Sequence, residues 1–174
     1  MTNHLSGYVA ATVLAGVGLL RAQSAQGKPD FSRTWILEST LTGPDVPQTL
    51  SVTQPLVTAN VRGEPMPPTY LRITITRTFG SNPVTEVHHI GTMGGIVGGI
   101  PADVVRTVRT RVDWEEQALA FEREAYTGSA PETGDWTSKR EVWSFDSDGR
   151  LRLVISTRGS AEAPRTTVLV YRRQ

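Results

Sequence analysis

The sequence has 174 residues, no cysteine, and 18 basic against 17 acidic side chains. A chain of this length can form one domain with a self-sustaining core, and the lack of cysteine excludes disulfides, thiolate catalysis and cysteine-ligated zinc. Arg21 is the only Lys, Arg, Asp or Glu in residues 1–27, so residues 28–174 are neutral overall. Such a body offers no excess of cations for nucleic-acid binding, and we expect no nucleic-acid partner.

Residues 1–27 form a leader that is distinct from the rest of the chain. Residues 5–20 are uncharged and mostly apolar, and the small residues Ala22, Ser24, Ala25 and Gly27 offer two cleavage frames of a bacterial export signal. The apolar stretch is shorter than the ~20 residues that cross a bilayer comfortably. No Lys or Arg precedes it, which departs from the usual signal pattern.

Two interpretations of the leader stay open: a cleaved signal peptide (residues 1–27) or a retained membrane anchor. Both place residues 28–174 in the periplasm, and an anchor would hold them at the membrane surface. The anchor residues would be Tyr8, Val9, Val13, Leu14, Val17, Leu19 and Leu20.

From Thr34 onward the apolar residues recur with a period of two, which is the pattern of β-strands. A proline loop at 63–68 and a glycine-rich loop at 91–101 interrupt this pattern, and 146–149 (DSDG) is typical of a hairpin turn. No long amphipathic helix is indicated after residue 27. The expected strands lie near 34–38, 48–53, 56–61, 70–79, 84–90, 104–114, 118–125, 137–145, 151–155 and 166–172.

The alternation also predicts which residues face the core. In 70–79 it places Leu71, Ile73 and Ile75 on the inner face. In 104–114 it places Val108, Val112 and Trp114 together, and it leaves Asp113 to Gln117 as a turn. About ten short antiparallel strands avoid exposed edges by closing or stacking, so we expect an all-β closed barrel, with a β-sandwich as the alternative.

Residues 29–37 (PDFSRTWIL) resemble the opening PDFSGTWKL of small exported bacterial lipocalin-like (calycin-type) proteins, with Arg33 in place of the usual glycine. The similarity continues through 112–114 with Leu119, through 141–145 with 148–150, and ends at 170–172. This resemblance implies a closed barrel of about 8–10 strands in residues 28–174. It also implies that Trp35 closes the barrel base beneath an arginine of the last strand, Arg172 or Arg173, through a contact of about 0.5–2 kcal/mol.

No group of residues in the sequence forms a recognisable catalytic or metal-binding motif. His88 and His89 are adjacent, so on a strand they face opposite sides and do not jointly bind a metal. The acids at 113–124 fit a solvated turn and strand face better than a carboxylate site. The glycine-rich run lacks the Lys-Ser/Thr of a P-loop, and no catalytic triad can be assembled. We therefore expect no enzyme activity, no metal and no cofactor.

Two segments are candidates for partner binding. Met93, Ile96, Val97 and Ile100 would be apolar contacts exposed on the glycine-rich loop. The basic residues Arg106, Arg109 and Arg111 would either pair with acids of a neighbouring strand, such as Glu122 or Glu124, or dock onto an acidic partner or lipid headgroups.

Two functions fit these observations. The first is a non-enzymatic, membrane-associated accessory subunit that docks on or braces a larger membrane protein complex; bacterial photosynthetic reaction-centre and antenna complexes are assemblies that recruit such subunits. The second is a lipocalin-like binder of a small apolar ligand in a barrel bounded by Trp114, Phe121 and Trp143. The cavity volume distinguishes a ligand carrier from a barrel filled by its own side chains.

Overall fold

The computed structural model describes residues 27–38, 43–99, 105–127, 135–160 and 163–174, without the side chains of 61, 93–99, 105–107 and 127. All regular structure in these ranges is β-strand, as predicted. The strands are β1 (Arg33–Leu37), β2 (Thr49–Thr53), β3 (Leu56–Val57), β4 (Asn60–Val61), β5 (Glu64–Pro65), β6 (Thr69–Tyr70), β7 (Arg72–Phe79), β8 (Asn82–His89), β9 (Thr92–Gly99), β10 (Val105–Glu115), β11 (Ala118–Thr127), β12 (Trp136–Phe145), β13 (Leu151–Gly159) and β14 (Arg165–Arg173).

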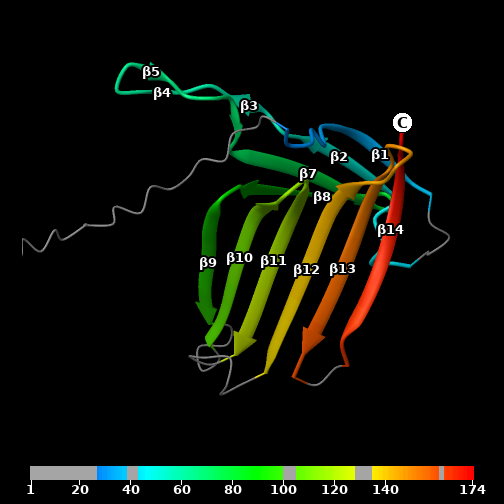
Figure 1. Cartoon of the computed structure of the whole chain (residues 1–174). Coiled ribbons are helices and arrows are strands. Elements are labelled where there is room, and N and C mark those ends of the chain that lie inside the picture. Colours follow the sequence, from blue (N-terminus) through cyan, green and yellow to red (C-terminus); the bar gives the residue numbers. More distant parts are fainter. Residues whose placement is uncertain (1–26, 39–42, 100–104, 128–134, 161–162) are drawn as a thin grey trace, which may run out of the picture.

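Ten of the strands form one antiparallel sheet in the order β8-β7-β2-β1-β14-β13-β12-β11-β10-β9. The sheet curls so that β1, β2, β7 and β8 cross over one end of the strands β10–β14, which makes a nearly closed barrel (Figure 1). The fold class predicted from the alternation, an antiparallel barrel, is confirmed. Strand β1 pairs with strand β14, so the first and last strands of the structure are neighbours in the sheet.

The two edge strands of the sheet, β8 and β9, are consecutive in the chain. The short link between them, at residues 90 and 91, is called the seam below. Between β8 and β9, the Ile90 amide donates to Leu71 O at 2.9 Å, and the Gly91 amide donates to Val112 O at 2.8 Å. The first bond continues the ladder of β8 with β7, and the second continues the ladder of β9 with β10, so the backbone changes partner between these two residues. Gly91 has a φ of 77°, a conformation that glycine adopts without strain.

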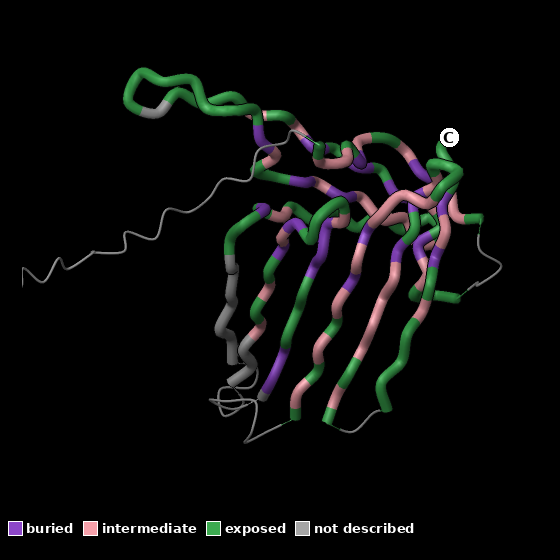
Figure 2. The backbone as a smooth tube through the Cα atoms, in the orientation of Figure 1, coloured by how far each residue is buried: buried purple, intermediate pink, exposed green. Residues whose placement is uncertain are grey.

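The core occupies the end of the barrel that the crossing strands cover (Figure 2). Inward positions on successive strands are apolar there, because the side-chain period of two assigns every second residue to the interior. Each large side chain that is fully buried contributes about 1.5–3 kcal/mol through the hydrophobic effect. The fully buried residues are Phe31, Trp35, Leu50, Ile73, Ile75, Leu119, Trp143, Leu151, Leu153, Leu169 and Tyr171.

Phe31 is the hub of the aromatic packing. Its ring lies 5.0 Å from Phe145, 5.9 Å from Trp143 and 6.2 Å from Trp114, measured between centroids. The carbonyl of Phe31 accepts a 3.0 Å hydrogen bond from Trp35 Nε1, which satisfies the buried indole. Phe31, two residues before β1, therefore fills one end of the barrel with its aromatic ring.

Residues 56–70 form an arm that projects from the barrel (Figure 1). Two short ladders, β3 with β6 and β4 with β5, run along it. Arg62 and Gly63 both have positive φ, 53° and 86°, which is the backbone of a type I′ hairpin turn at its tip. Residues 56–61 therefore do not form the continuous strand that the sequence predicts, because these bridges are isolated and join no larger sheet.

Three further local predictions need correction. Residues 92–99 are strand β9, not part of a loop, since β10 supplies a backbone partner along its length. Leu71 is exposed although Ile73 and Ile75 are buried, because β7 begins only at Arg72. The turn between β10 and β11 is confined to Glu116 and Gln117.

The hairpin predicted at 146–149 is confirmed. Asp146 Oδ1 accepts hydrogen bonds from the amides of Asp148 and Arg150, at 2.9 and 3.0 Å, and Gly149 supplies a φ of 73°. Burial alone would raise the pKa of Asp146, but these amides and the Arg150 side chain outweigh it and lower the pKa.

Candidate functional site

The inner surface of the barrel changes from apolar to polar along strands β10–β14. On β12 the inward residues run from Trp143, which is fully buried, through Glu141 to Lys139. On β11 they run from Leu119 through Phe121 to Arg123. The polar part begins at the edge of the core that strands β7 and β8 cover. The charged side chains at this edge form the candidate site.

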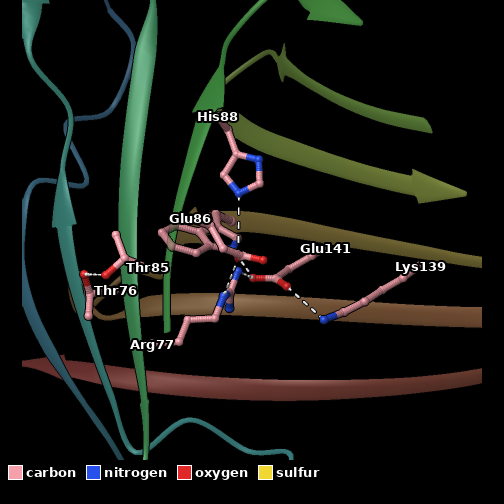
Figure 3. Close-up of polar contacts among 8 residues, drawn as sticks. Thr76, Arg77, Thr85, Glu86, His88, Lys139 and Glu141 are labelled. Carbon is pink, nitrogen blue, oxygen red and sulfur yellow. Dashed lines mark hydrogen bonds and ion pairs between the residues drawn. The ribbon is translucent and has the colours of Figure 1, made fainter. Parts of the chain in front are cut away.

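Arg77 on β7 lies between two carboxylates (Figure 3). Its Nη2 donates to Glu141 Oε1 at 2.9 Å, and its Nε donates to Glu86 Oε2 at 3.3 Å. The side chains of Arg77 and Glu141 are only 11% and 4% exposed, whereas that of Glu86 is 44% exposed. This ion-pair cluster joins β7 and β8 to β12 across the interior of the barrel.

The Glu141 carboxylate has two further partners. Trp143 Nε1 donates to Oε1 at 2.6 Å, and Lys139 Nζ lies 3.5 Å from Oε2. The Arg77 guanidinium also lies 5.7 Å from the centre of the Trp143 ring. A buried carboxylate is tolerated only when it is paired and hydrogen-bonded, and these contacts meet that condition.

His88 borders the cluster on β8. Its Nε2 lies 3.7 Å from Glu86 Oε2, and its ring meets Phe121 edge-on at 5.3 Å. The neighbouring His88 side chain, and after it Arg77, hold the pKa of Glu86 at about 2, against the opposing effect of its partial burial. At neutral pH Glu86 is therefore an anionic acceptor and is poorly suited to proton transfer.

A cavity of about 390 Å³ lies beside this cluster. Its polar wall includes the ion-pair cluster with Arg123 and Lys139, and also Thr110, Arg111 and Glu122. Its apolar wall includes Val108, Val112 and Phe121 from β10 and β11. A partly apolar cavity with a few convergent charged groups is the usual form of a small-molecule site.

The two histidines face opposite sides of β8, as predicted: His88 is partly buried against Phe121 and His89 is exposed. In the described part of the chain, no three His, Cys, Asp or Glu side chains converge as metal ligands would. The same residues include no helix of the length and hydrophobicity needed to span a membrane.

The basic residues proposed for partner binding lie on β10, and two of them have described side chains. The register places Arg109 opposite Glu124 and Arg111 opposite Glu122, the arrangement expected for a strand face paired with acids. Arg111 Nη2 also lies 2.9 Å from Asp113 Oδ2, and Arg109 lies 5.5 Å from the Tyr126 ring. The Arg106 side chain is outside the described atoms.

The apolar candidates for partner binding cannot be placed as side chains. Met93, Ile96 and Val97 belong to β9, where the backbone pairs with β10. Ile100 lies outside the described residues, and so do the leader residues proposed as an anchor.

The barrel-closure pair is only half as expected. Trp35 is buried and packs 5.6 Å from Phe145. The guanidinium nearest its ring is that of Arg33, at 5.8 Å, whereas Arg172 is exposed and lies 4.0 Å from Glu38. The register places Arg172 opposite Ile36, whereas Arg173, the other arginine named for this contact, is opposite Trp35 and is exposed.

The ion-pair cluster was missed from the sequence, although a signal for it exists. Arg77 continues the inward series of Ile73 and Ile75, and Glu141 has the same parity as Trp143. A charged residue at an inward strand position needs a buried partner, so the alternation alone marks both positions.

Comparison with known proteins adds no relative. No protein-family model matches this chain, and no curated protein sequence matches it significantly.

Proposed function

We propose that this protein is a non-enzymatic accessory subunit that docks, on the periplasmic side, on a larger membrane protein complex. The observation that carries this proposal is the arm, residues 56–70. The leader of residues 1–27 supports the periplasmic location, since its apolar stretch is typical of export signals and membrane anchors.

The arm has the properties of a docking element. Leu56 and Met66 are 54% and 39% exposed, although both are large apolar side chains. A two-stranded ribbon is at best marginally stable by itself in water, and of this one it is Tyr70, at its base, that packs against the barrel core. Pro65, Pro67 and Pro68 restrict its backbone, which lowers the entropy lost when a partner binds it.

Co-purification tests this function. The full chain, tagged at its C-terminus, is expressed in its native host, and membranes are solubilised in a mild detergent. We expect the tagged protein to elute with a larger membrane assembly, whose subunits mass spectrometry then identifies. A bacterial photosynthetic reaction-centre or antenna complex is one host that this proposal covers.

A matched pair of variants tests the arm. Leu56→Ser with Met66→Ser removes the apolar contacts and is expected to reduce recovery of the assembly severalfold, because each of these side chains loses its hydrophobic gain on burial, about 1.5–3 kcal/mol. Val168→Ser is the control, since Val168 is 37% exposed on β14, outside the arm. A wild-type protein recovered only as a monomer, or equal recovery of all three proteins, would refute the proposal.

A second candidate function is the binding of a small, largely apolar ligand inside the barrel. The cavity of about 390 Å³ favours it, because the interior beside Phe121 is not filled by side chains. Titration of the purified protein with an uncharged apolar probe, decanol, followed by calorimetry, tests this function. Saturable one-to-one binding is expected, and an absence of binding heat and of any thermal stabilisation would refute it.

A further inference from the structure

A row of opposed residues that contains three cationic side chains crosses the inner face of the barrel beyond the ion-pair cluster. The sheet register places Arg123 opposite Lys139, Lys139 opposite Thr157, and Thr157 opposite Arg165. Directly opposed residues on antiparallel strands share a face, with Cβ atoms about 4.5–5.5 Å apart. Two like charges therefore face each other at Arg123 and Lys139, an arrangement that destabilises a sheet unless something offsets it.

The carboxylates near this row leave it short of negative charge. Lys139 lies 3.5 Å from Glu141, but Glu141 is held more closely by Arg77 at 2.9 Å. Glu86 is likewise bound to Arg77. Among the described residues, no carboxylate lies within ion-pair distance of Arg123. Asp135 stands farther along the same surface, near Ser160, whose hydroxyl donates to it at 3.3 Å.

Arg123 and Lys139 stand where two cavities meet. Both residues line the cavity of about 390 Å³, and both line a second cavity of about 510 Å³ farther along β11–β13. The first cavity continues from this pair toward Phe121 and Val112. A single ligand could thus contact the cations with one end and the apolar wall with the other.

We infer that the barrel binds a small amphipathic anion, whose carboxylate or phosphate contacts Arg123 and Lys139 and whose apolar part lies against Phe121 and Val112. The ligand's negative charge offsets the repulsion between the two cations, and the planar guanidinium of arginine can donate two hydrogen bonds to a carboxylate or a phosphate. This inference rests on the second candidate function, because it names the ligand class of that cavity.

The test compares ligands that differ only in the head group. Purified full-length protein is titrated by calorimetry with decanoate, decyl phosphate and decanol below their aggregation concentrations, and with acetate and inorganic phosphate. We expect the charged decyl ligands to bind at least about tenfold more tightly than decanol, as a charge-assisted hydrogen bond allows. Acetate and inorganic phosphate should bind far more weakly, and the preferred decyl ligand tells a carboxylate from a phosphate.

Variants at the opposed pair sharpen the test. Arg123→Gln and Lys139→Gln should each weaken the binding of decanoate about tenfold and leave that of decanol unchanged. Arg152→Gln is the matched control, because Arg152 is exposed and lies on the outer face of β13, opposite Ser144. Both test positions are solvent-accessible, so the variants should fold, and circular dichroism with thermal unfolding checks this.

Each failure has a separate meaning. Equal binding of decanol and decanoate, or unchanged decanoate binding in the Arg123→Gln/Lys139→Gln double variant, overturns the inference but leaves the ligand-binding function standing. Acetate or inorganic phosphate binding as tightly as decanoate overturns the amphipathic ligand. No binding of any decyl compound overturns both the inference and the second candidate function.

Discussion

Glu86 gives the stability of this protein a dependence on pH that can be tested at one residue. Its pKa is about 2 in the folded protein, against 4.5 for the unperturbed side chain, so the unfolded chain binds a proton more readily. The contribution is therefore present above about pH 4.5 and is lost as the pH falls toward 2.

We expect Glu86→Gln to be less stable than wild type near neutral pH and to lose less stability between pH 4.5 and 2. Because the side chain is 44% exposed, solvent screening keeps the effect small, and added salt should reduce it further. Urea unfolding midpoints across this pH range measure it. Identical pH profiles for the two proteins would contradict the assignment.

Arg77 and Glu141 form the buried part of the same cluster and should be strongly coupled. Arg77→Leu leaves the Glu141 carboxylate buried without its closest cation, and we expect it to lose about 3 kcal/mol of unfolding free energy. The Arg77→Leu/Glu141→Leu double variant should lose clearly less than the sum of the single losses. Denaturant unfolding of all four proteins completes the cycle, and simple additivity would show that the pair is not coupled.

The sequence indicates where these charged residues point but not that they meet. Alternation with Ile75 and Trp143 places Arg77 and Glu141 inside the barrel. Their contact spans 64 residues of sequence and joins β7 to β12, which are not neighbours in the sheet. Only closure of the barrel brings them together, and no local pattern encodes that closure.

At the scale of elements, the alternation of apolar residues identified the long strands well. It failed for segments whose structure is determined by backbone pairing with a neighbouring strand. Ile73, Ile75, Val112 and Trp114 are buried as the period of two requires. Strand β9 has a glycine-rich sequence of low strand propensity, and its pairing with β10 overrides that weakness. The projecting arm was equally hard to foresee, since its short bridges carry no extended alternation.

The β10–β11 turn contains a residue in a conformation that suits glycine better. Glu116 has a φ of 53°, and its carbonyl accepts a 2.7 Å hydrogen bond from Lys28 Nζ. The left-handed conformation costs a non-glycine residue about 1–2 kcal/mol, while glycine loses about 0.5–1 kcal/mol more backbone entropy. We expect Glu116→Gly to be more stable by about 0.5 kcal/mol.

Thermal unfolding of Glu116→Gly beside Gln117→Gly checks this expectation. Gln117 is the other residue of the same turn, and it is not among the described residues with positive φ, so it serves as the control. The substitution leaves the carbonyl that Lys28 contacts in place. A lower unfolding temperature for Glu116→Gly than for the control variant would contradict the argument.

At the scale of the molecule, the strand order divides the barrel into two unequal parts. Strands β9–β14 follow one another as simple hairpins, whereas β1, β2, β7 and β8 are hydrogen-bonded to them in the sheet through the pairing of β1 with β14. Ile90 and Gly91 connect β8 to β9 along the chain. The barrel class was predictable from the number and alternation of the strands. The position of the seam was not, because it is the point at which the backbone changes from pairing with β7 to pairing with β10, which side-chain identity does not mark.

Removal of residues 165–174 tests this division. The truncated chain keeps the hairpins of β9–β13 but leaves β1 without its partner, so we expect rapid proteolysis of 27–90 and slower cleavage of 105–160. Limited proteolysis with mass spectrometry reads this difference, with the full chain as the control. Uniform digestion of the truncated chain would show that the barrel unfolds as a single unit.

The pairing of β1 with β14 also fixes an order of events during synthesis. Residues 33–37 leave the ribosome among the first of the domain, yet their partner at 165–173 is made last. The early strands must therefore wait without this partner, and the barrel cannot close before β14 has been translated. The barrel therefore closes after translation of β14 and not strand by strand as the chain emerges.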